Sequence, residues 1–174
     1  MRGWFFIFLF LPACVWSQLT TSSMGPGALV QNVLLGPGVT VSNINYSGTS
    51  NAIGYFNAAG TNLGIAEGIV MTTGTIYNNG DGPHGPNNSS GSGVDNGMGG
   101  YSQLSNLIGG TQTYNTAILE FDFVPYSDTV RFKYVFGSEE YPEYVGSTFN
   151  DVFAFFISGP GISGLQNIAR LPNG

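Results

Sequence analysis

Residues 117–136, AILEFDFVPYSDTVRFKYVF, decide the fold class, because they read as two strands joined by a tight turn. Apolar and polar side chains alternate through residues 117–124 and again through residues 129–136. A period of two is typical of a β-strand that has one face on a core. Pro125-Tyr126-Ser127-Asp128 lies between the two and has the composition of a turn. The pattern therefore predicts a β-hairpin.

The four-residue turn sets which residues of this hairpin face each other. Asp122 then lies opposite Arg131, and Glu120 lies opposite Lys133. Each such pair contributes about 0.2–1 kcal/mol across a sheet. We predict that these two ion pairs hold the hairpin while the opposite face of each strand packs inward. The inward side chains are then Leu119, Phe121, Phe123, Val130, Phe132, Tyr134 and Phe136.

A further strand is predicted in residues 151–157, DVFAFFI, which are apolar on both faces after the first residue. Such a run is typical of a central strand that is covered on both sides. Asp151 shares a face with Phe153 and Phe155. A carboxylate at the start of a buried strand requires hydrogen bonds, a cation or a raised pKa.

Shorter strands are predicted nearer the N-terminus. Residues 39–44 alternate clearly, and residues 52–56 and 69–74 are further candidates, whereas residues 28–35 read as either a strand or a short helix. With this many strands, turns and aromatic side chains, we predict an all-β fold. The expected architecture is a two-sheet β-sandwich of jelly-roll type.

A Gly/Asn-rich loop occupies residues 78–100. Loops of this length in compact domains are usually functional or disordered, and we expect this one to carry variable contacts. Asp95-Asn96-Gly97 hints at a calcium loop but lacks the spaced acids of an EF-hand.

The N-terminus reads as an export signal covering residues 1–17. Its apolar run, residues 4–11, is too short for a bilayer, which requires about 20 residues, but suits a signal peptide. Cleavage before Gln18 would leave residues 18–174 as one secreted or cell-surface domain. Cys14 supports an alternative, because Leu11-Pro12-Ala13-Cys14 looks like the cleavage box of a bacterial lipoprotein with an acylated cysteine.

Charge and cysteine content exclude several classes of function. Beyond residue 17 the chain carries ten acids and three bases, a net charge of −7. Such a surface repels phosphate backbones, so nucleic acid is not an expected partner, and it attracts divalent cations. Cys14 is the single cysteine of the sequence, so the mature domain has neither a disulfide framework nor a cysteine-based zinc site.

An acidic segment, residues 137–151, connects the predicted hairpin to the predicted central strand. Calcium binds six to eight oxygens in flexible geometry, which this segment can supply. The predicted calcium ligands are Glu139, Glu140, Glu143, Asn150 and Asp151. Tyr141 and Tyr144 stand beside these acids and could stack on a sugar ring, although packing over the end of the sandwich explains them equally well. The alternative for the acids is a solvated loop in which Asn150 and Asp151 cap a turn.

An enzyme is the competing hypothesis. Glu120 and Asp122 are neighbours on one face of a strand and resemble the carboxylate pair of jelly-roll glycosidases, which lie about 5–5.5 Å apart in retaining enzymes. A basic partner opposite each acid would lower its pKa, which does not suit a general acid. We therefore predict that the domain has no catalytic residues.

Three blocks of this chain resemble the choice-of-anchor L domain family. They are LEFDFVP (residues 119–125), VFGSEEYPEYV (residues 135–145) and FNDVFAFFISGPG (residues 149–161), with weaker matches at residues 68–74 and 107–110. The resemblance implies a module of secreted or surface proteins of gram-negative bacteria, whose chains usually end in a sorting or anchoring domain, including those of type IX secretion and gliding motility.

The resemblance implies location more than activity. We expect a non-enzymatic module for adhesion or ligand display, with surface glycans or other cell-surface proteins as partners and with contact to the membrane only through a C-terminal anchor or an acylated Cys14. Asn115 stands where family members often have an acid. The family pattern normally continues through further strands, so the domain is expected to be incomplete at its C-terminus.

Overall fold

The computed structural model describes residues 19–76, 95–138, 144–149 and 151–170, and these are mostly β with short helices. The strands are β1 (Thr20–Ser22), β2 (Val39–Ser47), β3 (Ile53–Asn57), β4 (Glu67–Met71), β5 (Ile118–Pro125), β6 (Phe156–Ile157) and β7 (Gln166–Asn167). The helices are α1 (Pro26–Leu29), the π-helix η1 (Val30–Leu34), the 3-10 helix η2 (Ser50–Ala52) and α2 (Ser102–Leu107). The predicted signal peptide lies outside the described residues.

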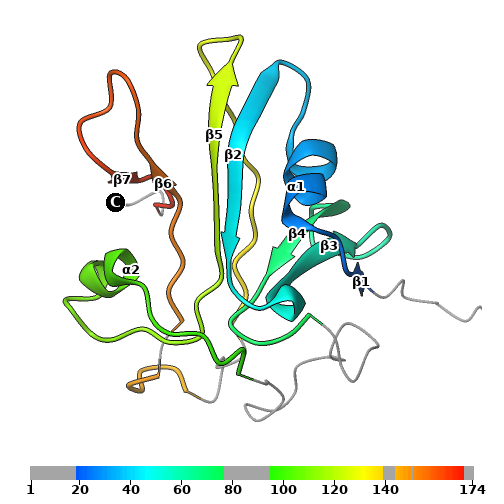
Figure 1. The fold of residues 1–174 in the computed structure, drawn as a ribbon. Helices are drawn as coiled ribbons and strands as arrows, with labels where there is room; N and C mark the ends of the chain where they lie inside the picture. Colours follow the sequence, from blue (N-terminus) through cyan, green and yellow to red (C-terminus); the bar gives the residue numbers. More distant parts are fainter. Residues whose placement is uncertain (1–18, 77–94, 139–143, 150, 171–174) are drawn as a thin grey trace, which may run out of the picture.

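The strands form three small antiparallel sheets, ordered β1-β3-β4, β2-β5 and β6-β7. Figure 1 shows the long β2-β5 pair at the centre, with the first sheet and α1 on one side and the β6-β7 pair on the other. The predicted β class is therefore confirmed for the described residues. The two-sheet jelly roll stays a prediction, because the strands of the described residues form three small sheets of three, two and two strands instead of two larger ones.

The buried core lies in the N-terminal part of the chain, where α1 and η1 pack beside the β1-β3-β4 sheet (Figure 1). Its buried apolar side chains are Leu29, Val30, Ala52, Ile53, Phe56, Ala58 and Ile76. Gly54 on β3 is required by close packing, because a Cβ there would stand 2.5 Å from the carbonyl oxygen of Ser22 on β1. Thr21 on β1 donates to the carbonyl oxygen of Ile76 at 2.7 Å, which ties the first strand to this core.

Of the two possibilities for residues 28–35, the helix is the one that forms. Pro26 opens α1, a position that suits proline because its missing N–H would be unpaired in any case. The helical residues end at Leu34, and Leu35 is already extended. A turn follows in which Gly38 has a φ of 90°, which suits glycine, and β2 begins at the next residue. The predicted strands at residues 39–44 and 52–56 are confirmed as parts of β2 and β3, and β4 overlaps residues 69–74.

The hairpin prediction is only half right. Its first strand is confirmed as β5, but β5 pairs with β2, and residues 129–138 form no strand. Neither the Glu120–Lys133 nor the Asp122–Arg131 ion pair is among the contacts of the described residues. Pairing with β2 occupies one edge of β5 and leaves its other edge open. The two ion pairs predicted at that edge are exposed, and exposed ion pairs stabilise a local hairpin by little.

The predicted central strand is also corrected. Only Phe156 and Ile157 of residues 151–157 join a strand, β6, and none of the seven residues is buried. Phe153 is 39% exposed. An apolar run predicts a buried strand only if other elements cover both of its faces, and these side chains stay half-buried or exposed.

Candidate functional site

Most residues of the predicted calcium site lie outside the part of the chain that the structure describes. Glu139, Glu140, Tyr141, Glu143 and Asn150 lie outside the described residues. Asp151 is described and half-buried, and its Oδ2 accepts a hydrogen bond of 3.1 Å from the Ser138 hydroxyl. Within the described ranges no three histidine, cysteine, aspartate or glutamate side chains gather into a possible metal site.

Tyr144, the second predicted ligand-binding tyrosine, packs edge-on against Phe149, with ring centroids 5.3 Å apart. A turn brings the two rings together, since the backbone N–H of Ser147 donates to the carbonyl oxygen of Tyr144 at 2.9 Å and Gly146 has a φ of 79°. Both rings stay exposed. The structure thus combines both interpretations of Tyr144, because its ring packs on a neighbour and still faces solvent.

A larger aromatic surface lies immediately before and after the acidic segment. We call it the aromatic ladder, and it consists of Phe132, Tyr134, Phe136, Phe153 and Phe155. Phe132 stacks on Phe155 with centroids 5.4 Å apart, and Tyr134 lies 5.5 Å from Phe153. Because residues 132 and 134 contact residues 155 and 153 in reverse order, the two segments run antiparallel.

The aromatic ladder is open to solvent. Tyr134 is 46% exposed and Phe136 is 52% exposed, and every residue from Val124 to Ser138 is classed as exposed. The alternation predicted that Phe132, Tyr134 and Phe136 share one face, and their common ring contacts confirm this. It predicted an inward face, which is wrong. No local signal distinguishes the two outcomes, because the alternation is the same whether or not another layer covers the rings.

Of the two carboxylates of the enzyme hypothesis, Asp122 has a structural hydrogen bond. β2 carries a bulge between Ser42 and Asn45, and Asn43 in this bulge has a φ of 52°, which asparagine tolerates better than most residues. The amide Nδ2 of Asn43 donates to Asp122 Oδ2 at 2.6 Å. Glu120 is exposed and lies opposite Asn45. These acids therefore stand on an open strand, and Asp122 has an amide partner from β2.

Asp95 and Asn96 form a polar cluster that the sequence did not reveal. Asn96 is buried, and its Nδ2 donates to the carbonyl oxygens of Asn115 at 2.7 Å and Thr116 at 3.4 Å, while its Oδ1 accepts from the N–H of Met98 at 2.8 Å. Asn115, with a φ of 54°, donates to Asp95 Oδ1 at 2.9 Å. The amides of Asn96 and Asn115 thus hold two loop segments together, and both polar ends of the Asn96 side chain make structural hydrogen bonds.

Two tyrosines elsewhere have perturbed acidity. The Tyr55 hydroxyl donates to Glu67 Oε2 at 2.6 Å, and this hydrogen bond raises the pKa of Tyr55. Partial burial raises the pKa of Tyr46, whose hydroxyl donates to the carbonyl oxygen of Thr49 at 3.0 Å. Both phenols hold strands or turns in place and lie outside the acidic segment.

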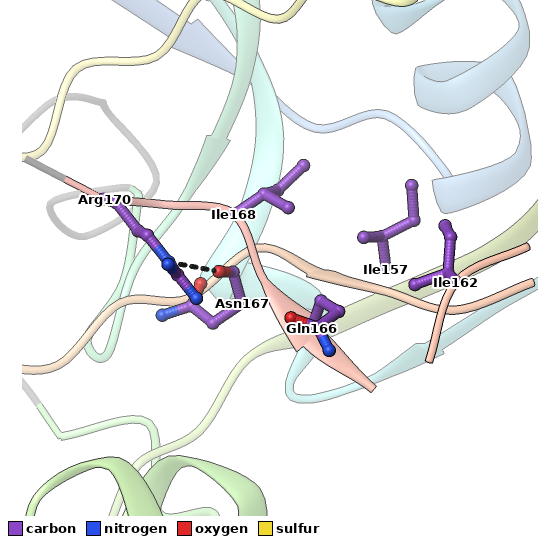
Figure 2. A pocket seen from close by; sticks show the side chains of 6 residues that line it. All are labelled: Ile157, Ile162, Gln166, Asn167, Ile168 and Arg170. Atoms are coloured by element: carbon purple, nitrogen blue, oxygen red, sulfur yellow. Dashed lines mark hydrogen bonds between the residues drawn. The ribbon is translucent and has the colours of Figure 1, made fainter. Parts of the chain in front are cut away.

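A shallow hollow of about 540 Å³ opens beside the β6-β7 pair. Figure 2 shows Ile157 and Ile162 together in its lining, with Arg170 turned back over Asn167. The Arg170 Nε donates to the Asn167 carbonyl oxygen at 3.1 Å. None of the six described lining residues is a carboxylate or a histidine, the side chains that most often act as general acids or bases.

Comparison with known proteins gives a family. The model of the Choice-of-anchor L domain matches residues 18–174, which is nearly the whole chain. No curated protein and no solved structure matches this chain. A domain of this kind implies a secreted or surface-associated, non-catalytic module. In the described residues, no helix combines the length and the apolar character needed to cross a bilayer. By its match over residues 18–174, the chain belongs to the choice-of-anchor L domain family.

Proposed function

We propose that this domain is an adhesion or ligand-display module that binds surface glycans or other cell-surface proteins through the aromatic ladder. The observation that carries the proposal is the exposure of Tyr134, Phe136 and Phe153 in one set of mutually contacting rings. Contiguous exposed apolar patches are uncommon on soluble proteins and usually mark a binding site.

The chemistry of the ladder suits a sugar ring. Aromatic faces bury large areas at a small cost in side-chain entropy, and a tyrosine adds a hydroxyl that can exchange a hydrogen bond with a sugar hydroxyl. Among the described residues, the Tyr134 hydroxyl has no hydrogen-bond partner, and it is therefore available to a ligand. Tyr144, whose ring faces solvent, belongs to the proposed ligand-binding residues, as does Tyr141, which lies outside the described residues.

Calcium is the proposed cofactor of this surface. Asp151 lies two residues before Phe153, so a cation held by Glu139, Glu140, Glu143, Asn150 and Asp151 would stand at one end of the ladder. The donor set supports the proposal, because carboxylate and amide oxygens are the ligands that calcium prefers. Such an ion would link the acidic segment to the start of the run that carries Phe153. The two-sheet sandwich remains our proposed architecture for the whole domain.

The binding proposal is tested by glycan arrays with the mature chain, residues 18–174, followed by titration calorimetry with the best ligand. Tyr134→Ala is expected to weaken binding at least about thirtyfold, as replacement of a central aromatic contact usually costs about 2 kcal/mol or more. Tyr126→Ala is the matched control, since Tyr126 is 72% exposed and takes part in no ring contact of the described residues. Equal affinities for the two variants would contradict the proposal.

The calcium proposal is tested separately by thermal melting with calcium or with a chelator. Binding to the folded state alone raises stability by about 2.7 kcal/mol at a hundredfold excess over the dissociation constant. Asp151→Ala should remove this increase, whereas Asp128→Ala, a matched acid in the exposed turn, should retain it. A melting temperature that is the same in both solutions would show that the acidic segment is a solvated loop.

A further inference from the structure

Within the described part of the chain, the backbone groups of residues 130–137 have no backbone hydrogen-bond partner. None of these residues takes part in a backbone–backbone hydrogen bond with another described residue, and all of them are exposed. The side chains at alternate positions hold the segment in place by ring contacts with Phe153 and Phe155. Such a segment can accept another strand by edge-to-edge pairing.

The segment also carries unpaired positive charge. Within the described part of the chain, Arg131 and Lys133 make no ion pair and no side-chain hydrogen bond. They are two of the three bases in a mature chain of net charge −7. A strand with acids at alternate positions would therefore fit this segment in both backbone geometry and charge.

The chain itself contains such a strand. β5 carries Glu120 and Asp122 at alternate positions and pairs with β2, the one partner strand that the described residues provide for it. Glu120 is exposed and has no hydrogen bond or ion pair among those residues. β5 and the open segment are joined by a short turn, yet they do not pair within one chain.

We propose that two copies of this chain associate by reciprocal strand pairing, in which β5 of each copy adds to residues 129–136 of the other. Glu120 then faces Lys133 of the second copy, and Asp122 faces Arg131 of the second copy. Reciprocal exchange closes the assembly with two equal contacts, as in a two-fold dimer. Pairing of residues 129–136 with the same segment of the second copy would instead bring four bases together, which is unfavourable.

This proposal goes beyond ligand binding and uses a different part of the segment. The strand contact uses backbone groups and the charged side chains, whereas the aromatic ladder lies on the other face. Loss of ligand binding in the Tyr134 variant and loss of association in a charge variant are therefore separate results.

The test is sedimentation velocity on the mature chain over a range of concentrations, with the variants Glu120→Lys and Lys133→Glu. Each reversal changes two contacts per dimer from attraction to repulsion, so we expect the dissociation constant to rise about tenfold or more. An equimolar mixture of the two variants should recover the dimer, because both contacts of the mixed dimer are again between opposite charges. Asp128→Lys, which reverses an exposed acid outside the contact, should associate like the unchanged chain.

Two results would overturn the proposal. One is a mature chain that stays monomeric at every concentration. The other is a mixture that stays monomeric while the double variant Glu120→Lys/Lys133→Glu regains the stability that each single variant loses. That result would place the pairing within one chain, as a hairpin.

Discussion

Replacing Asn96 by alanine should destabilise the domain far more than the composition of its loop suggests. The Asn96 side chain is 8% exposed and makes three hydrogen bonds, two as donor and one as acceptor. Alanine would leave the Asn115 carbonyl oxygen and the Met98 N–H without these partners in a half-buried place. Each unsatisfied buried group costs about 1–3 kcal/mol. Because the 3.4 Å bond to Thr116 is weak by geometry, we count two groups. Since both are half-buried, we take the lower part of this range, about 1–2 kcal/mol for each, and expect a loss of about 2–4 kcal/mol.

The assay is urea unfolding followed by circular dichroism, with the free energy of unfolding extrapolated to water. A loss of this size is a large share of the roughly 5–15 kcal/mol that stabilises a typical domain. In a chain of this length it lowers the melting temperature by about 4–16 °C. The slope of free energy against urea should stay unchanged, because the surface exposed on unfolding is the same.

The matched control is Asn57→Ala. Asn57 is also an asparagine whose Oδ1 accepts from a backbone N–H, that of Ala59 at 3.0 Å, but it is exposed, so water replaces the lost bond. We expect this variant to lose less than about 1 kcal/mol. If Asn96→Ala lost no more than Asn57→Ala, the interpretation of Asn96 as a buried clamp would be refuted.

Three further predictions follow from local geometry. Gly54→Ala should lower the melting temperature strongly in a calorimetric scan, because its Cβ would stand 2.5 Å from the Ser22 carbonyl oxygen, and an unchanged melt would contradict the packing described. Asn115→Asp should destabilise the domain at pH 7, since a carboxylate would replace the amide that donates to Asp95, and the loss should shrink near pH 3 in melts at both values. The raised pKa of Tyr46 contributes stability that is fully present below pH 10 and is lost as the pH rises through the folded-state pKa. The free energy of unfolding, measured at pH 9 and at pH 11, should therefore fall more for the wild type than for Tyr46→Phe.

The local signals of the sequence were sufficient for individual strands. Alternation in residues 117–124 predicted β5, with Leu119, Phe121 and Phe123 more buried than Glu120 and Asp122, as observed. The reason is that side-chain direction along a strand has a period of two whatever the strand's partner. The export signal and the calcium ligands were also inferred from local composition, and they stay predictions.

The strand pairing next to the candidate surface depends on contacts between segments that are distant in the sequence. The turn at residues 125–128 favoured a local hairpin, but β5 pairs with β2, which lies about eighty residues earlier in the chain. The same pairing brings Asn43, in the bulge of β2, within hydrogen-bond distance of Asp122. The pattern of charges in the sequence does not predict this uncharged partner.

The sequence by itself determined the β class, the position of most strands, the alternation of their side chains and the membership of a family of surface modules. Only the tertiary structure decided which strands pair, that Asn96 is a buried clamp, and that Phe132, Tyr134 and Phe136 lie open to solvent. The physical reason is that periodicity depends on the backbone of one segment, whereas burial depends on whether a distant segment covers it. An aromatic alternation is therefore the same in a core and in a binding surface.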